Sequence, residues 1–254
     1  MTRTLDIVIR SFHRDRRWLA LALRSIAVFA SGHRRVVVVV PRSSLGRMDR
    51  EEIESDRVRL RVCRDYADDY LGQQITKLHA DLYTDAEVIL HLDSDQVFVA
   101  PCDLTARLFD HGRPRMAFDS RSTRPATDGW RQCPAAFLGE PVEPDVTSPP
   151  PVVVPRDVYA AVRGWCRHAH GMPIDRYALT AGVGLFCEFA LLRGFALTRE
   201  RERYAWVDTA HGFLLPECQN FWSRAQTPAS VAGTLPPELA SACPTGPRKG
   251  LEVP

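Results

Sequence analysis

The chain has 254 residues, of which 45% are hydrophobic and 25% are charged, and its formal net charge is +2. This length suffices for one large domain or two small ones, and the composition is that of a folded globular protein, which excludes a wholly disordered chain. The positive charge is almost all arginine, spread between acidic residues and not gathered in a stripe with aromatic residues, so the sequence predicts no nucleic-acid partner.

Strands and helices alternate in the first hundred residues. Short apolar strands are expected at Leu5–Ile9, Val36–Val40, Val58–Val62 and Val88–Leu92. Helices are expected between them, at Arg14–Ser31, 49–55 and Gly72–Tyr83. This order predicts an α/β fold with a mostly parallel sheet flanked by helices on both faces.

The pattern changes after Pro101. We expect a short helix at Asp103–Phe109, a strand at Arg115–Phe118, a loop-rich segment over 119–151, and helices at Pro155–His168 and Ala181–Arg193. Residues 227–254 are rich in proline, serine and threonine, which predicts a loosely ordered tail.

The cysteines and the apolar runs bear on the cellular compartment. The seven cysteines are an odd number, widely spaced, and none forms Cys-x-x-Cys, which argues against a disulfide framework or a zinc knuckle. The longest apolar run, Val36–Val40, is far too short to span a bilayer, and no signal-peptide region follows Met1. We therefore expect buried thiols and a soluble, cytoplasmic protein without a transmembrane segment; peripheral membrane association and the oligomeric state stay open.

Two polar loops follow predicted strands. Arg10–Arg14 follows the first strand, and Asp93-Ser94-Asp95-Gln96 follows the fourth. Ligands of open α/β sheets bind at the carboxyl ends of the strands, where both loops are expected. Two carboxylates so placed need a cation or strong donors, and hard oxygen ligands suit Mg²⁺ or Mn²⁺, which also bind phosphates. A solvated turn is the plain alternative.

The fourth strand carries a family resemblance. The run Ile89–Asp95, followed by Val97–Pro101, resembles the Asp-x-Asp strand and loop of GT-A glycosyltransferases, and Gln73–Leu78 resembles the segment before that motif. The similarity is greatest to a group of bacterial sugar transferases of largely unassigned activity, and more distant to the retaining family that includes the lipopolysaccharide galactosyltransferases and glycogenin. It is good over 5–102 and weaker over 147–195, where Ser148–Pro150 and Phe186–Phe189 are similar to later motifs.

The resemblance implies a GT-A-like, Rossmann-like fold in a single domain over 1–226, with a nucleotide-binding half at 1–102 and an acceptor-binding half at 103–226. It also implies transfer of a sugar from a nucleoside diphosphate sugar, with UDP as the favoured carrier. The acceptor is a sugar, a lipid-linked sugar or a small natural product.

The resemblance assigns residues to the donor and to Mn²⁺ or Mg²⁺. Asp95 would bind the metal, and Asp93 the metal or the ribose. His211 would be a third metal ligand, with His13, His168 and His170 as competitors. The donor would also be bound by residues near the first and fourth strands, namely Ser11, Phe12, Arg14, Gln74, Lys77 and Ser94.

Glu188 and Asp208 are the candidates for catalysis on the acceptor side. Glu188 interrupts the apolar run Val183–Leu192, where a carboxylate is costly unless it lies at a helix end or in a site. By the resemblance it would act as a base or orient the acceptor hydroxyl. An exposed position on an amphipathic helix is the alternative, and Asp208 is then the next candidate.

Two other classes of protein compete with a transferase. A haloacid-dehalogenase-type phosphatase also carries Asp-x-Asp after a strand, but there the motif follows the first strand and a lysine follows it, whereas here the only later lysine is Lys249. A nucleotide-binding protein without turnover is the other alternative. A dehydrogenase is disfavoured because no Gly-x-Gly-x-x-Gly follows the first strand.

Overall fold

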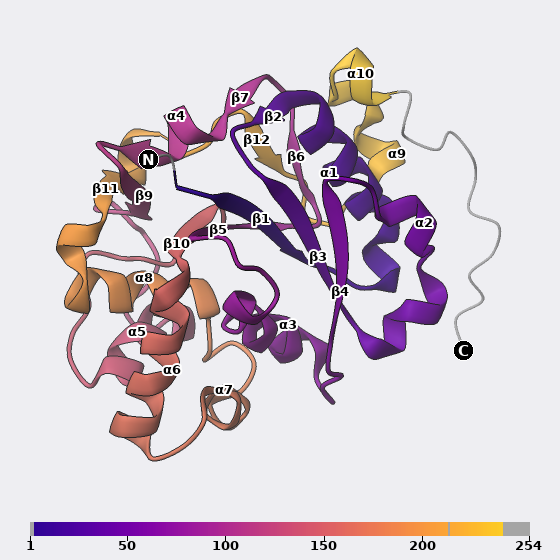
Figure 1. Cartoon of the computed structure of the whole chain (residues 1–254). Helices are drawn as coiled ribbons and strands as arrows, with labels where there is room; N and C mark the ends of the chain where they lie inside the picture. The colour runs from indigo at the N-terminus through magenta and orange to yellow at the C-terminus, as the bar shows by residue number, and fades with distance from the viewer. Residues whose placement is uncertain (1–2, 213, 241–254) are drawn as a thin grey trace.

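A five-stranded sheet forms the centre of the computed structural model, which describes residues 3–212 and 214–240 (Figure 1). Its strands, in spatial order, are β10 (Val152–Pro155), β5 (Val88–Asp93), β1 (Leu5–Arg10), β3 (Arg35–Pro41) and β4 (Val58–Cys63). Four of them are parallel, and β10 runs antiparallel to β5. The predicted α/β class with a mostly parallel sheet is therefore confirmed.

Helices cover both faces of this sheet because both faces are apolar. Ile7 and Ile9 of β1 pack with Leu19 of helix α1 (Arg16–Phe29) on one face. Val8, the residue between them, packs with Ile75 of α3 (Asp69–Lys77) on the other face, together with α6 (Arg156–His170) and α8 (Glu188–Arg199). Burial of alternate side chains on opposite faces explains why these strands are continuously apolar.

Smaller elements complete the domain. Three further sheets pair β11 (Ala205–Asp208) with β9 (Arg113–Phe118) and β8 (Phe109–Asp110), β12 (Cys218–Asn220) with β6 (Gln96–Phe98), and β2 (Ala30–Ser31) with β7 (Cys102–Asp103). The remaining α-helices are α2 (Arg50–Ile53), α4 (Leu104–Leu108), α5 (Gly129–Leu138), α7 (Ile174–Ala181), α9 (Pro228–Val231) and α10 (Pro237–Ala240). Single 3-10 turns lie at His13–Asp15, Arg42–Arg47, Ala80–Leu82, Arg201–Arg203, Thr209–His211 and Ala232–Thr234.

Two predictions for the second half of the chain are wrong in detail. The loop-rich segment 119–151 contains α5, which continues through Pro134, and a strand, β10, follows it. The helix predicted at Ala181–Arg193 starts too early, because α7 ends at Ala181 and α8 begins only at Glu188. They are separated by a turn in which Gly182 and Gly184 have φ of 86° and 82°, a conformation that glycine adopts without strain and that no α-helix contains.

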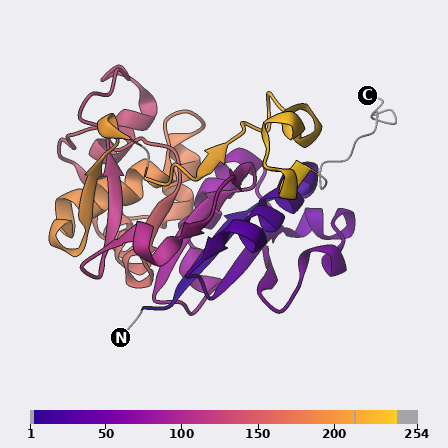
Figure 2. The same cartoon turned by 90° about the horizontal axis from the view of Figure 1, so that it is seen from above.

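The C-terminal segment is ordered further than the composition predicted. Thr227 caps α9 through a capping box, and Val231 and Leu239 are buried in a cluster with Trp18 and Leu21 of α1. In Figure 2 this segment returns across the first half of the chain, while the pink and orange second half lies on the other side. The tail predicted at 227–254 is therefore packed up to residue 240, and residues 241–254 lie outside the described part.

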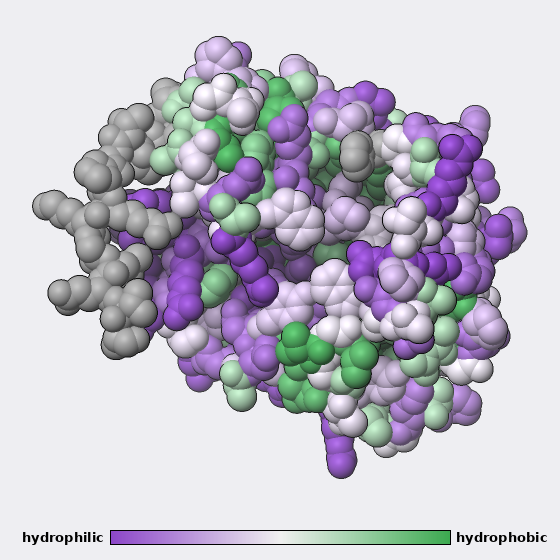
Figure 3. All heavy atoms as spheres, turned by 180° about the vertical axis from the view of Figure 1, so that it is seen from behind, coloured by the Kyte–Doolittle hydropathy of each residue, from purple (hydrophilic) through white to green (hydrophobic). Residues whose placement is uncertain are grey.

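The described cysteines are free thiols and lie mostly in the interior. Of the six described cysteines, none is in a disulfide and only Cys218 is not fully buried; Cys243 lies outside the described residues. Within residues 3–212 and 214–240 no helix is both long and apolar enough to cross a bilayer. Figure 3 shows a hollow near the centre of one face, and hydrophobic residues gather there only in small groups.

Candidate active site

The Asp-x-Asp turn lies at the carboxyl edge of the central sheet. Asp93 is the last residue of β5 and stands opposite Arg10, the last residue of β1. Gln96 holds the turn, because its Oε1 accepts from the Asp93 backbone N–H at 2.9 Å while its Nε2 donates to the Pro150 carbonyl at 2.8 Å. The turn is thereby fixed from both sides, at the edge where ligands of such sheets bind.

A buried ion-paired cluster holds Asp93. Lys77, at the end of α3, donates to Asp93 Oδ1 at 2.7 Å and to Glu188 Oε1 at 2.9 Å, and its ammonium lies 4.4 Å from the centre of the Phe189 ring. Burial alone would lower the pKa of Lys77, but the charges of Asp93 and Glu188 outweigh burial and raise its pKa above the ordinary value. The lysine is therefore a permanent cation between two carboxylates.

This pairing decides where Glu188 lies. Glu188 is the first residue of α8 and only 4% exposed, so the alternative of an exposed helix residue is wrong. It stands at a helix N-terminus, where the helix dipole favours a carboxylate. It is not among the residues that line the large cavity described below, so its described contact toward Asp93 runs through Lys77.

Asp95 is bound by a segment that returns from the C-terminal part of the chain. The backbone N–H of Phe221 donates to the Asp95 carbonyl at 3.0 Å, and that of Ser223 donates to Asp95 Oδ2 at 2.8 Å. Trp222, between them, is 64% exposed with a positive φ of 45°, and Arg224 lies 5.2 Å from the centre of the Tyr70 ring. The segment 221–224 therefore places an exposed indole and a guanidinium beside the Asp-x-Asp turn.

The structure adds a third carboxylate that the sequence did not reveal. Asp15 follows the first-strand loop and accepts a hydrogen bond from Ser94 Oγ at 3.3 Å. Burial, and after it the charge of Asp95, raises the pKa of Asp15 to about 6. Negative charge is therefore in excess at this edge of the sheet, which is the condition that a bound cation relieves.

The other predicted donor residues lie near β1 and α3. Ser11 is buried, and its Oγ has no hydrogen-bond partner among the described residues; Phe12 is half-buried and Arg14 exposed. Gln74 is buried and donates to the Phe186 carbonyl at 3.1 Å, so it fixes the turn before Glu188. Ser11 Oγ and Gln74 Oε1 are thus both buried without a partner among the described residues, while the Gln74 amide nitrogen is occupied.

His211 and Asp208 are not brought to this turn. His211 is exposed on a 3-10 turn, and its described charged neighbour is Asp208, at 3.9 Å. Asp208 accepts from the Ser120 backbone N–H at 3.1 Å and from Ala210 N–H at 3.0 Å, so it fastens two loops together. Among residues 3–212 and 214–240, no three His, Cys, Asp or Glu side chains are grouped to hold a metal. The predicted three-ligand set with His211 is therefore not formed.

Two carboxylates nevertheless fit a divalent cation that is also bound by a substrate. Asp93 Oδ2 and Asp95 Oδ1 have no hydrogen-bond partner among the described residues, and Asp15 adds to the local negative charge. Mg²⁺ is typically bound by one or two carboxylates together with substrate phosphates. The donor set therefore suits a metal shared with a nucleoside diphosphate.

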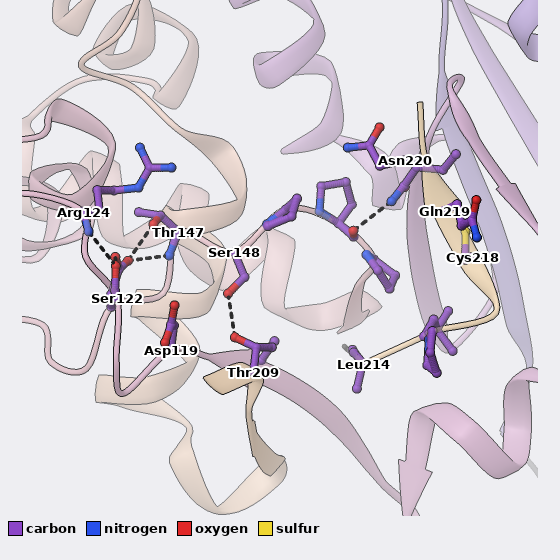
Figure 4. Close-up of a pocket in the computed structure, with 18 of the residues that line it drawn as sticks. Asp119, Ser122, Arg124, Thr147, Ser148, Thr209, Leu214, Cys218, Gln219 and Asn220 are labelled. Atoms are coloured by element: carbon purple, nitrogen blue, oxygen red, sulfur yellow. Dashed lines mark hydrogen bonds between the residues drawn. The ribbon is translucent and has the colours of Figure 1, made fainter. Parts of the chain in front are cut away.

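A cavity of about 1040 Å³ adjoins the turn. It begins at Gln96 and Trp222, and is bounded by β12, the 119–128 loop and the 145–151 loop (Figure 4). Hydroxyl groups line one side, with Ser148 and Thr209 3.5 Å apart, while Leu214 and Cys218 line the other. The fully buried Arg193 holds the 145–151 wall, since it donates to the carbonyls of Val146, Ser148 and Pro149.

The fold is similar to that of a solved galactosyltransferase. The structure of LgtC in complex with donor and acceptor sugar analogues matches with a TM-score of 0.50 and 15% identity, over 96% of this chain and 98% of that chain. A structure of an active-site mutant of LgtC matches with a TM-score of 0.43 and 12% identity, over 70% of each chain. No family model matches the sequence, and a search of curated proteins finds no match. The predicted GT-A fold is confirmed by the first of these structures.

Proposed function

We propose that this protein is a glycosyltransferase that transfers a sugar from a nucleoside diphosphate sugar to an acceptor hydroxyl. The observation that carries the proposal is the position of Asp93 and Asp95, beside Asp15 and Lys77, at the carboxyl edge of a GT-A sheet and next to a large polar cavity. Fold likeness alone would not suffice, because one fold hosts many functions.

The donor is proposed to bind between the first-strand loop and the segment 221–224. The unpaired Ser11 hydroxyl supports a nucleoside position at the end of β1. Asp93 and Asp95 would hold Mn²⁺ or Mg²⁺ together with the diphosphate, and UDP is the favoured nucleotide. The chemistry that the cation supplies is neutralisation of charge that develops on the departing diphosphate. Arg224, on the segment that binds Asp95, is positioned to add to this neutralisation.

Lys77 and Glu188 are proposed to keep Asp93 in place. Without Lys77, three carboxylates would face one another across the turn, and without Glu188 the lysine would have only one anionic partner. A buried charge is tolerated only when it is paired, so the cluster fixes the Asp93 carboxylate before the donor binds. Glu188 then acts through Lys77, whether or not it also reaches the acceptor.

The acceptor is proposed to occupy the cavity of about 1040 Å³. Its hydroxyl-lined wall suits the hydroxyl groups of a sugar, and the exposed Trp222 at its entrance offers a face for stacking. Leu214 and Cys218 form an apolar wall. A sugar that carries an apolar group, as in a lipid-linked sugar or a small glycosylated natural product, therefore fits better than an all-polar chain.

The phosphatase alternative is disfavoured by the topology. The motif follows β5 after β1, β3 and β4 have been formed, whereas that class uses the first strand. Within the described residues the lysine near the motif is Lys77, which precedes it and is committed to two carboxylates. The other alternative, a protein that binds a nucleotide without turnover, is distinguished from a transferase by the following experiment.

Nucleotide-sugar turnover tests the proposal. The protein is incubated with UDP- and GDP-sugars, with Mn²⁺ or with EDTA, and release of the nucleoside diphosphate is measured with and without sugar acceptors. We expect Mn²⁺-dependent release from at least one UDP-sugar, increased by an acceptor and lost in Asp95→Asn. Tight binding with no release from any donor would favour the non-catalytic alternative.

A further inference from the structure

A second cavity, of about 470 Å³, lies toward the opposite end of the sheet from Asp93. Its wall includes Thr84 and Asp85, which precede the first residue of β5, whereas Asp93 is the last residue of that strand. The six residues of β5 separate the two places by roughly 17 Å at ~3.3 Å per residue. A ligand in this cavity therefore does not reach the Asp-x-Asp turn.

The floor of the cavity is an arginine-bearing corner of the sheet. Arg35 and Val37 of β3, and Arg59 and Arg61 of β4, lie two residues apart on their strands, so they project from one face. The register pairs Val37 with Arg59 and places Arg61 opposite Val39. Arg156, the first residue of α6, adds a fourth guanidinium from the side.

Two carboxylates in the wall do not neutralise these arginines, because other arginines already bind them. Asp81 forms a two-point pair with Arg163, at 2.6 and 2.7 Å. Asp85 is bound by Arg34 at 2.5 Å. Neither Arg163 nor Arg34 lines the cavity. The four lining arginines therefore leave a net positive charge in the cavity; of these arginines, only Arg35 has a further carboxylate, Asp6, within 4 Å among the described residues.

The four guanidinium groups also keep most of their donors free. Within the described part of the chain Arg61 has no hydrogen bond or ion pair, and Arg59 donates only to the Ser55 carbonyl, at 2.6 Å. Arg156 donates only to the Asp81 carbonyl, at 3.2 Å. The nearest carboxylate oxygen to Arg35 is 3.9 Å away, on Asp6, which Arg34 already binds at two points.

We infer that this cavity is a binding site for a small anion that carries a diphosphate group. Guanidinium groups match phosphate oxygens in pairs, and like charges around one cavity repel each other until an anion neutralises them. The cavity volume is many times the roughly 30 Å³ that one water molecule occupies, so the cavity has room for more than a single phosphate group. Leu82, 68% exposed, and Tyr83 form an apolar side of the cavity that leaves room for an organic group such as a nucleoside.

This site is independent of the proposed transfer reaction, and its test uses no metal. Inorganic pyrophosphate and ADP are titrated into the full-length protein in EDTA by calorimetry, so that the Asp-x-Asp turn has no cation to bind them. We expect both to bind, and Arg59→Gln/Arg61→Gln to bind at least 30-fold more weakly. Arg167→Ala/Arg176→Ala removes the same charge from two exposed residues of α6 and α7 and should change affinity less than about twofold.

Further variants keep the result interpretable. Asp95→Asn should bind pyrophosphate like the parent, which separates this site from the Asp-x-Asp turn. If the double variant of β4 does not fold, Arg156→Gln, on a different element, should weaken binding at least fivefold. A parent that fails to bind either ligand at millimolar concentration, or a variant of Arg59 and Arg61 that binds like the parent, would overturn the inference. Binding only to vesicles of phosphatidylglycerol, with no response to soluble diphosphates, would overturn it as well.

Discussion

Lys77 Nζ lies 2.7 Å from Asp93 Oδ1, which joins the end of α3 to the end of β5 at the carboxyl edge of the sheet. The same ammonium lies 2.9 Å from Glu188, 111 residues further along the chain. One buried cation thus sets the position of a carboxylate that we propose to bind the donor.

Replacing Lys77 tests how far the fold depends on this cation. Lys77→Met leaves two carboxylates without their partner, and loss of one member of a buried pair costs about 3–5 kcal/mol. We expect a decrease of that size in the free energy of unfolding, measured with urea. The double variant Lys77→Met/Glu188→Gln should lose less than the sum of the single variants. Strict additivity would show that the two side chains do not interact.

Glu188→Gln keeps the shape of the side chain and removes its charge. Because Lys77 still pairs with Asp93 in this variant, we expect nucleotide affinity within ~threefold of the parent; if Glu188 acts on the acceptor hydroxyl, transfer is ~10²-fold slower or more. The measurement is kcat for sugar transfer beside the Kd for UDP with Mn²⁺. Unchanged transfer would make Glu188 a structural residue, and Asp208 would become the next candidate.

We predict that the free energy of unfolding depends on pH through the Asp15 carboxyl group. Its pKa is about 6 in the fold and 3.8 in the unfolded chain, so the folded state holds the proton more tightly between these values. The stabilisation that comes from this protonated carboxyl group is fully present below pH 4 and is lost as the pH rises through 6. Without metal, the free energy of unfolding of Asp15→Asn should therefore exceed that of the parent by about 1 kcal/mol at pH 8, after allowance for partial exposure, and should show no gain at pH 4. Asp56→Asn, at an exposed site, is the control; an equal gain in that variant would remove Asp15 as the cause.

We predict that replacing the buried Arg193 changes both the stability of the fold and binding in the acceptor cavity. Its guanidinium is fully buried and donates to loop carbonyls, including those of Val146 and Pro149 at 3.3 and 3.0 Å. Arg193→Met leaves these carbonyls unpaired, and we expect a loss of about 3–5 kcal/mol and a raised KM for the acceptor. Arg199→Met, on the same helix but part-exposed and paired with Glu140, should cost about 1 kcal/mol or less. Similar losses in both variants would argue against a specific role of Arg193.

Local patterns were sufficient to predict the first half of the fold. Continuous apolar runs placed β1, β3 and β5 within one residue at each end, because strands buried on both faces have no alternating pattern to confuse them, and alternating apolar residues placed β4 equally closely. Their order along the chain then predicted where the Asp-x-Asp turn lies. Pro134 hid α5, since proline inside a helix argues against one, and the Gly182–Gly184 turn was read as helix because its neighbours are apolar.

The contacts of the site were less accessible to sequence reasoning. Asp15 fell inside the helix predicted at Arg14–Ser31 and carried no signal of its own, and only the fold brings it to Ser94, 79 residues away. The segment 221–224 carries no motif, yet its backbone binds Asp95. Arg59 and Arg61 alternate along β4, but their shared cavity depends on Arg156 and on carboxylates that are already paired elsewhere. Such charge balances depend on tertiary contacts and not on spacing.

The assignment of Asp95 is tested most directly by calorimetric titration of UDP, with Mn²⁺ and with EDTA, into a parent that carries Arg59→Gln/Arg61→Gln, so that the second cavity does not contribute, and into its Asp95→Asn variant. We expect the parent to bind UDP at least tenfold more tightly with Mn²⁺, since the cation would join Asp93 and Asp95 to the diphosphate, and we expect Asp95→Asn to lose this difference. Asp103→Asn, a helix cap away from the turn, should keep it. Equal affinity of the parent for UDP in both buffers, or a metal-dependent gain that survives in Asp95→Asn, would contradict the assignment of Asp95 as a metal ligand and with it the proposed donor site.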